Sequence, residues 1–189
     1  MTQVPTSHLR DRGKNARRNL DAELHAEYSR SVCRHFLNSS LFFRSKTIAC
    51  YLPVVGEVDT RIIFERAWRA RKPIFVPVVD DGHEMRFVQI KRNSRLELNR
   101  FGIWEPVSGS LIAAKKLDVV ATPLVAFDAN LNRIGMGGGY FDRCFHFLRG
   151  QRQWSRPKLA GIAFECQRVE KILPKPWDIR LYRVFTEMR

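Results

Sequence analysis

Short apolar segments alternate along the chain with segments of helical pattern, and this alternation limits the folds that are open to it. Residues 117–127 are apolar at almost every position, as in a strand buried on both faces of a sheet. In residues 21–37, apolar side chains recur every four residues, and Asp21 is a favourable N-cap. The alternation predicts a three-layer α/β/α domain with a mainly parallel central sheet. The predicted strands are residues 47–52, 73–79, 117–127, 158–164 and 183–187, and the predicted helices are residues 7–19, 21–37, 60–72 and 140–148.

The region from 80 to 110 departs from this alternation. Asp80-Asp81-Gly82 is typical of a turn, and residues 84–90 partly alternate, so we expect them to form an antiparallel hairpin with the preceding strand. Residues 93–110 have no clear period and are expected to be mostly loop. A length of 189 residues fits one domain, so we expect a single domain over residues 1–189, with residues 1–7 as a flexible lead-in.

Composition and charge restrict the possible partners. No stretch approaches the roughly 20 continuous apolar residues of a membrane span, and residues 1–7 lack a secretory apolar run, so we expect a cytoplasmic protein without membrane contact. The net charge of +14 favours polyanions, including nucleic acid. The basic residues are spread out, however, and match no zinc finger, basic zipper or RNA-recognition sheet. Nucleic acid is therefore a secondary candidate partner, and we expect a monomer.

The four cysteines are widely spaced and form no Cys-x-x-Cys pair, which argues against a zinc site. Cys33 and Cys50 lie in apolar patterns and are expected to be reduced core residues. Cys144 and His146 lie near Asp142, where a nucleophile or a metal ligand is conceivable. Simple packing of a helix is the favoured interpretation of this pair.

Four glycines occur within residues 135–139, directly after the longest apolar segment and a polar turn. Glycine can adopt positive φ values, and successive backbone N–H groups can then converge on an anion. A helix is predicted from Tyr140, so a bound phosphate would lie at a helix N-terminus. The spacing matches neither a Walker A loop nor a dinucleotide fingerprint, which leaves a phosphate cradle and a tight structural turn as alternatives. Arg133 and Arg143 place positive charge on both flanks.

Residues 123–128 and 133–143 together resemble the signature of the 5-formyltetrahydrofolate cyclo-ligase family, also called methenyltetrahydrofolate synthetases. The resemblance extends in the same order over nearly the whole chain. It implies the fold predicted above and an ATP-dependent conversion of 5-formyltetrahydrofolate to 5,10-methenyltetrahydrofolate, with ADP and phosphate released through a phosphorylated formyl (imidate-phosphate) intermediate. The other matching segments are Leu9-Arg10, Tyr51-Leu52-Pro53, Gly56-Glu57-Val58-Asp59-Thr60, Phe101-Gly102-Ile103-Trp104-Glu105-Pro106, Trp177-Asp178 and Thr186-Glu187.

The resemblance also implies two substrate sites that share the glycine loop. Glu57 would accept hydrogen bonds from the pterin ring, although its residue type alone fits equally well with charge complementarity at a helix N-terminus. The implied ATP-binding residues are Arg10, Arg133, Ile134, Gly135, Met136, Gly137, Gly138, Gly139, Tyr140 and Phe141. The implied residues for the reduced folate are Leu52, Glu57, Phe101, Met136, Gly137, Gly138, Gly139 and Tyr140.

Two acidic residues are candidates to bind the Mg²⁺ that would accompany ATP. Asp142 could hold the ion beside a phosphate, and Asp178 matches an acidic position that the resemblance associates with Mg²⁺. A salt bridge between Asp142 and a neighbouring arginine is the alternative. Trp177 and Thr6 depart from the family pattern, which more often has His and a basic residue there. Two other functions stay open: a nucleic-acid-binding protein without catalysis on the same fold, and a phosphotransferase or ligase acting on another N-formyl compound.

Overall fold

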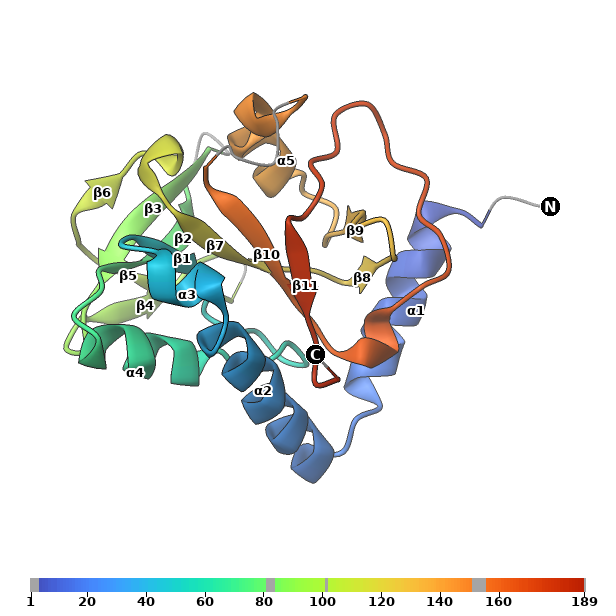
Figure 1. Ribbon diagram of the computed structural model, residues 1–189, viewed down its shortest axis with the longest axis horizontal. Coiled ribbons are helices and arrows are strands. Elements are labelled where there is room, and N and C mark those ends of the chain that lie inside the picture. Colours follow the sequence, from blue (N-terminus) through green and yellow to red (C-terminus); the bar gives the residue numbers. More distant parts are fainter. Residues whose placement is uncertain (1–3, 81–83, 101, 151–155, 189) are drawn as a thin grey trace.

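The computed structural model describes residues 4–80, 84–100, 102–150 and 156–188. Seven strands form the central sheet in the order β11-β10-β7-β1-β2-β3-β6 (Figure 1). The five strands from β11 to β2 are parallel, and β3 and β6 are antiparallel to their neighbours, which confirms the mainly parallel sheet and the predicted hairpin. The strands are β1 Ile48–Cys50, β2 Ile74–Val79, β3 Met85–Ile90, β6 Leu111–Ile112, β7 Val119–Pro123, β10 Lys158–Ile162 and β11 Arg183–Phe185.

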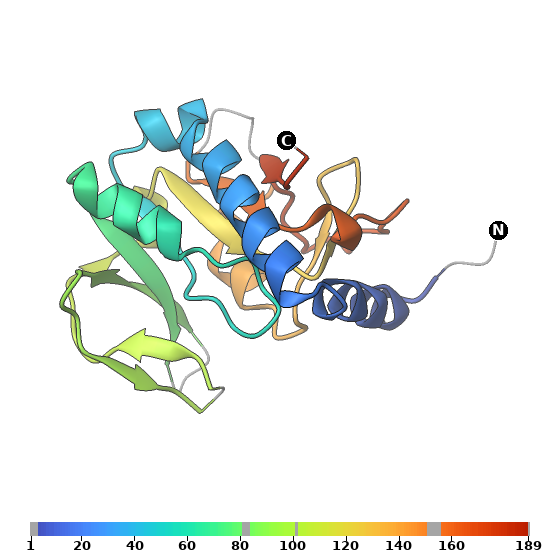
Figure 2. The same ribbon diagram turned by 90° about the horizontal axis from the view of Figure 1, so that it is seen from below.

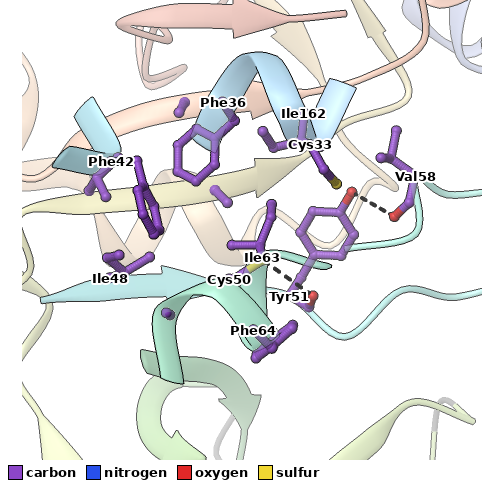
Figure 3. Packing of buried hydrophobic residues seen from close by; sticks show 14 of the residues in the cluster. Cys33, Phe36, Phe42, Ile48, Cys50, Tyr51, Val58, Ile63, Phe64 and Ile162 are labelled. Atoms are coloured by element: carbon purple, nitrogen blue, oxygen red, sulfur yellow. Dashed lines mark hydrogen bonds between the residues drawn. The ribbon is translucent and has the colours of Figure 1, made fainter. Parts of the chain in front are cut away.

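One face of the sheet is covered by three helices, α2 Ala22–Leu37, α3 Ser40–Arg44 and α4 Arg61–Arg69 (Figures 1 and 2). Helix α2 begins where the sequence predicts, because Asp21 Oδ1 accepts a hydrogen bond from Leu24 N at 2.8 Å. The ring of Phe36 packs edge-on against Phe42 of α3, with 6.0 Å between the ring centroids (Figure 3). It also packs edge-on against Phe185 of β11, with 5.4 Å between the centroids. Burial of one such side chain contributes about 2 kcal/mol to folding.

The opposite face of the sheet is covered by a helix that is shorter than the sequence predicts. Helix α5 spans only Tyr140–Cys144 and is followed by a 3₁₀ turn, His146–Leu148, so the prediction of one helix over 140–148 is wrong in extent. Phe145 and Phe147 both pack against this face of the sheet. Two residues that are two positions apart cannot share one side of an α-helix, and the break of the helix at Phe145 lets both rings reach the sheet.

Helix α1 Thr6–Arg18 lies beside the sheet, against the hairpin β8 Ala126–Phe127 and β9 Arg133–Ile134 and the 3₁₀ turn Glu165–Gln167 (Figure 1). Its buried residues recur every four positions and are Leu9, Gly13 and Arg17. A Cβ atom on Gly13 would lie 2.3 Å from the carbonyl oxygen of Val125, so glycine permits an approach that any other residue would prevent. The helix begins at Thr6, within the last two residues of the segment that the sequence suggests as a lead-in.

The described part of residues 93–110 is mostly loop, as expected, but it also holds two short strands, β4 Leu96–Leu98 and β5 Trp104–Pro106, which pair as a separate antiparallel sheet. The apolar segment 117–127 is not one strand, since β7 ends at Pro123. The Gln167 side chain donates its amide N–H groups to the carbonyls of Leu124 and Val125, both at 2.9 Å. These side-chain bonds satisfy backbone groups at the point where the chain leaves the sheet.

Candidate active site

A cavity of 1220 Å³ opens at the carboxyl ends of the parallel strands, where α/β sheets bind ligands. Its lining includes Leu52 after β1, Val79 at the end of β2, and Pro123 at the end of β7. The volume exceeds the range usual for one small ligand, about 300 to 1,000 Å³. Every described residue that the sequence assigns to a substrate or to Mg²⁺ lines this cavity: Arg10, Leu52, Glu57, Arg133, Ile134, Gly135, Met136, Gly137, Gly138, Gly139, Tyr140, Phe141, Asp142 and Asp178.

The glycine loop has a backbone conformation that explains its composition. Gly137 and Gly139 have φ values of +113° and +67°, in the region that side chains disfavour. A Cβ atom on Gly138 would lie 2.5 Å from the ring of Tyr140. Arg143 closes the loop from the helix side, since its Nη1 donates to the Gly138 carbonyl at 2.9 Å and its guanidinium lies 5.0 Å from the Tyr140 ring centroid. The loop is therefore held in one shape with its backbone exposed to the cavity.

Helix α1 brings a second cation to the loop. Arg10 Nε donates to the Gly135 carbonyl at 3.0 Å, and a Cβ atom built on Gly137 would lie 3.9 Å from Arg10 Cζ. The guanidinium thus lies against the loop, as an anion-binding role for both segments requires.

Arg133 and Asp142 form an ion pair, which confirms the salt-bridge alternative for Asp142. Arg133 Nη2 lies 2.9 Å from Asp142 Oδ1, and the Arg133 side chain is only 4% exposed. The same carboxylate oxygen accepts a hydrogen bond from Ile179 N at 3.0 Å, while Arg133 Nη1 donates to the Ile179 carbonyl. Asp142 therefore fastens the glycine-loop helix to the segment that carries Asp178, where Lys175 N donates to Asp178 Oδ2 at 2.8 Å.

The donor set for a metal ion is small. In the ranges that the structure describes, no group of three or more His, Cys, Asp or Glu side chains could hold a metal ion. Asp142 and Asp178 nevertheless line the same cavity. Mg²⁺ in nucleotide sites is commonly held by one or two carboxylates together with substrate phosphates and water. Two carboxylates beside the glycine loop fit that arrangement.

Glu57 is a buried carboxylate at the edge of the cavity. Its Oε2 accepts a hydrogen bond from Val54 N at 3.2 Å, and its Oε1 lies 3.6 Å from Arg17 Nη1. Burial raises the pKa of Glu57, and the Arg17 guanidinium opposes that rise. The helix N-terminus alternative for Glu57 is wrong, because Asp59 Oδ1 accepts the Arg61 N–H at the start of α4.

Several cavity residues are not expected from the sequence. Trp104 and Ile103 line the cavity from β5 and the residue before it, and Met85 lines it from β3. Phe101, which is expected to contact the folate, lies outside the described residues. The sequence gives no specific role to Arg17, because its acidic partner, Glu57, lies in a distant part of the chain.

Cys144 does not have the properties of a nucleophile. Burial raises the pKa of its thiol to about 11, and its Sγ donates to the Met85 carbonyl at 3.7 Å. His146 Nδ1 lies 2.8 Å from the Arg143 carbonyl. Cys33 and Cys50 are buried free thiols, as expected, and burial raises the pKa of Cys33 to about 12. These groups support packing instead of covalent chemistry.

The described part of the chain contains no helix that is long and apolar enough to cross a membrane.

Residues 3–187 match the model of the 5-formyltetrahydrofolate cyclo-ligase family. The 5-formyltetrahydrofolate cyclo-ligase of Haemophilus influenzae is 32% identical over 182 residues, covering 93% of this chain and 94% of the relative. The Escherichia coli K12 enzyme of the same name is 34% identical over 179 residues, covering 92% and 95%.

Two solved structures share the fold of this chain. The structure of the Aquifex aeolicus 5,10-methenyltetrahydrofolate synthetase superposes with a TM-score of 0.84 at 30% identity, covering 98% of this chain and 91% of that one. A synthetase from Mycoplasma pneumoniae shares the fold, with a TM-score of 0.76 at 23% identity over 97% and 99% of the two chains. The fold, the cavity and the sequence matches agree, and the chain belongs to the 5-formyltetrahydrofolate cyclo-ligase family.

Proposed function

We propose that the protein converts 5-formyltetrahydrofolate to 5,10-methenyltetrahydrofolate with consumption of ATP and release of ADP and phosphate. The observation that carries this proposal is the shared cavity, in which the glycine loop and the buried Glu57 carboxylate line one space. Its 1220 Å³ exceeds what one small ligand needs, which supports simultaneous binding of a nucleotide and a folate. Family membership supports the same reaction.

The reaction proceeds in two chemical steps. The formyl oxygen attacks the γ-phosphorus of ATP, the bond to the β,γ-bridging oxygen breaks, and ADP leaves with that electron pair. N10 of the folate then attacks the activated formyl carbon, loses its proton and closes the five-membered ring, and the C–O bond breaks to release phosphate. No enzyme nucleophile is needed, so the protein contributes positioning and charge stabilisation. The raised pKa of Cys144 is consistent with such a mechanism.

The glycine loop and Arg10 are the proposed binding elements for the ATP phosphates. Positive φ values at Gly137 and Gly139 turn the loop sharply beside the cavity. Arg10 contacts the loop by a hydrogen bond from its Nε to the Gly135 carbonyl. Backbone N–H groups and a guanidinium are suited to phosphate oxygens. In this proposal the loop residues also contact the folate, because the transferred phosphoryl group must reach the formyl oxygen.

Glu57 is the proposed anchor of the pterin ring. A carboxylate can accept two parallel hydrogen bonds from the ring's amino and N–H groups, and such a pair is strong where water is excluded. Leu52 and Met85 provide apolar cavity wall near the carboxyl ends of the strands. Glu57 would thereby fix the orientation of the folate relative to the glycine loop.

Asp142 and Asp178 are the residues proposed to hold Mg²⁺ when MgATP is bound. Asp142 Oδ1 is committed to Arg133 and Ile179 N, so its other oxygen is the one that could reach the ion. Mg²⁺ bound there would offset the negative charge of the phosphates. Asp142 itself also keeps Arg133 and the Ile179 backbone in place beside the nucleotide.

The test is MgATP-dependent formation of the methenyl chromophore from 5-formyltetrahydrofolate. Asp142→Ala and Glu57→Gln are each expected to lower kcat/KM by about 10²-fold or more, because each removes a charged contact to a substrate or its support. Glu27→Gln, an exposed carboxylate on α2, serves as the matched control and is expected to be neutral. A folded wild-type protein that binds MgATP but forms no chromophore would point to another N-formyl substrate. Absence of ATP binding, with a salt-sensitive RNA affinity, would favour the nucleic-acid-binding alternative.

A further inference from the structure

Arg17 is a buried arginine next to Glu57. It is not part of the glycine loop and is not among the residues that line the cavity. The Arg17 side chain is 4% exposed and that of Glu57 is 9% exposed, and their charged atoms Nη1 and Oε1 are 3.6 Å apart. Among the described residues, Glu57 lines the cavity and Arg17 does not. The guanidinium therefore lies on the protein side of the carboxylate, while the other side of the carboxylate faces the cavity.

The Arg17 guanidinium makes only weak hydrogen bonds to the described backbone. Its Nη1 donates to the Leu124 carbonyl at a long 3.4 Å, and its Nε is buried without a partner in the described part of the chain. A buried donor without a partner is unfavourable and is rare in native proteins. The arrangement keeps a positive charge next to Glu57 at the expense of good hydrogen bonding elsewhere.

The backbone around Glu57 is held by other residues. His25 Nε2 lies 2.9 Å from the Glu57 carbonyl oxygen, and Tyr51 Oη donates to the Val58 carbonyl at 3.4 Å (Figure 3). One residue further, Asp59 N donates to Ser29 Oγ at 3.0 Å. Three contacts, from α2 and from the residue after β1, thus fix the loop without Arg17. Arg17 acts on the carboxylate group itself.

The charge of Glu57 depends on its surroundings. Burial raises the pKa of Glu57, and Arg17 is the charged group that lowers it, assisted by the Val54 N–H. Among the described residues, Tyr51, His25 and Asp59 also lie near this loop, and burial raises the pKa of Tyr51 well above its ordinary value. Without Arg17, the carboxyl group would be protonated at higher pH than in the wild type. A protonated carboxyl group cannot accept two hydrogen bonds from a pair of N–H donors in the same way.

We propose that Arg17 is a positioning residue for the folate substrate, because it keeps the Glu57 carboxylate that faces the pterin ring in its ionised form. This inference rests on the proposed function, because it takes the pterin as the ligand of Glu57. Arg17 stands seven residues after Arg10 on α1, so one helix face carries both arginines. Arg10 supports the nucleotide side of the cavity, and Arg17 supports the folate side.

The experiment measures the Michaelis constants for the folate substrate and for MgATP, from initial rates of ADP formation, between about pH 6 and about pH 9. The variants are Arg17→Gln and Arg17→Met, which remove the charge, and Arg17→Lys, which keeps it. Arg18→Gln, at the adjacent exposed arginine of α1, is the matched control. For the neutral variants we expect a Michaelis constant for the folate that rises about tenfold per pH unit below the new pKa of Glu57 and approaches the wild-type value at high pH. The Michaelis constant for MgATP and the whole Arg18→Gln profile should match the wild type, and Arg17→Lys should keep the wild-type pH midpoint.

Three results would overturn the inference: a wild-type Michaelis constant for the folate in the neutral variants at every pH, an increase by the same factor at every pH, or an equal increase for MgATP. If the neutral variants do not fold, the double variant Arg17→Gln/Glu57→Gln removes both buried charges and takes their place. Its Michaelis constant for the folate should equal that of the Glu57→Gln variant alone, and a further loss would show that Arg17 acts independently of Glu57. A wild-type protein without folate-dependent ADP formation would instead contradict the proposed function.

Discussion

Replacing Gly13 with alanine would test how closely α1 must approach the segment after β7. The added Cβ atom would lie 2.3 Å from the Val125 carbonyl oxygen, whereas ordinary contact begins at 3.4 Å. The neighbouring atom is backbone, which cannot swing away as a flexible side chain can. Helix α1 must therefore move outward by about 1 Å at this point, the difference between the clash and an ordinary contact.

The stability effect has two opposing parts. Alanine favours a helix over glycine by about 0.5 to 1 kcal/mol. Overpacking of a tight contact costs about 1 to 3 kcal/mol. We expect a net loss of about 1 kcal/mol, which for a chain of this size lowers the Tm by about 2 to 4 °C.

The effect on activity should be larger than the effect on stability. Gly13 lies between Arg10 and Arg17, so an outward shift displaces both guanidinium groups relative to the cavity. A misplacement of about 1 Å can reduce a rate by about 10²-fold. We expect kcat/KM for both substrates to fall by about 10-fold to 100-fold in Gly13→Ala.

The assay combines steady-state kinetics for each substrate with thermal unfolding followed by circular dichroism. Asn15→Ala is the matched control, since it adds no atom to the interface and lies at an exposed position of the same helix. A Gly13→Ala protein that is at least as stable and as active as the wild type would refute the reasoning from close approach.

Other perturbations test the remaining parts of the structure. In Gly138→Ala, the new Cβ atom would lie 2.5 Å from the Tyr140 ring and distort the loop, so calorimetry should find MgATP binding weakened by about tenfold or more with little change in Tm; unchanged affinity would contradict the phosphate cradle. Burial alone would raise the pKa of Asp118, but the N–H groups of Thr47 and Lys46 and the Arg156 charge outweigh it, and the pKa is lowered. The resulting stability is present above the ordinary value of 3.8 and is lost as the pH falls through the lowered value. Urea unfolding should therefore find Asp118→Asn less stable by about 1 kcal/mol at neutral pH, with the difference disappearing in strong acid, and a difference that persists there would contradict the assignment. Cys144→Ala should keep kcat within about twofold, because a thiol with a pKa of about 11 is not a nucleophile at neutral pH, and a loss of kcat with an unchanged fold would reopen covalent catalysis.

The parts of the fold that depend on local signals can be predicted from the sequence. Helix α2 lies within one residue of its predicted bounds because Asp21 caps it, and the buried parallel strands stand out because both their faces are apolar. The hairpin β4–β5 escapes prediction because three-residue strands are too short to show an alternating pattern. The end of β7 cannot be predicted for a different reason. The carbonyl groups after the strand are bonded by the Gln167 amide, which comes from a distant segment of the chain.

The candidate site shows the same division. The glycine loop can be predicted because its composition is itself the signal, and Glu57 because it follows a strand at the ligand-binding edge. The pairing of Arg17 with Glu57 cannot be predicted from the sequence. A basic residue on a basic helix looks like solvated surface until its burial and its partner are known. Likewise, only the folded arrangement decides that Asp142 is paired with Arg133.

The position of α1 also bears on how the protein would lose activity under stress. The helix is anchored outside the two large clusters of buried side chains, through Leu9 in a small cluster with Ala126, Ile134, Val169 and Ile172. Elements with few buried apolar contacts open at a lower free energy than the core of a protein. Local detachment of this one helix would withdraw Arg10 and Arg17 together while the sheet stayed intact. Ligands that bind only the docked form would pull the equilibrium back, so the substrates themselves act as stabilisers of the catalytically competent state.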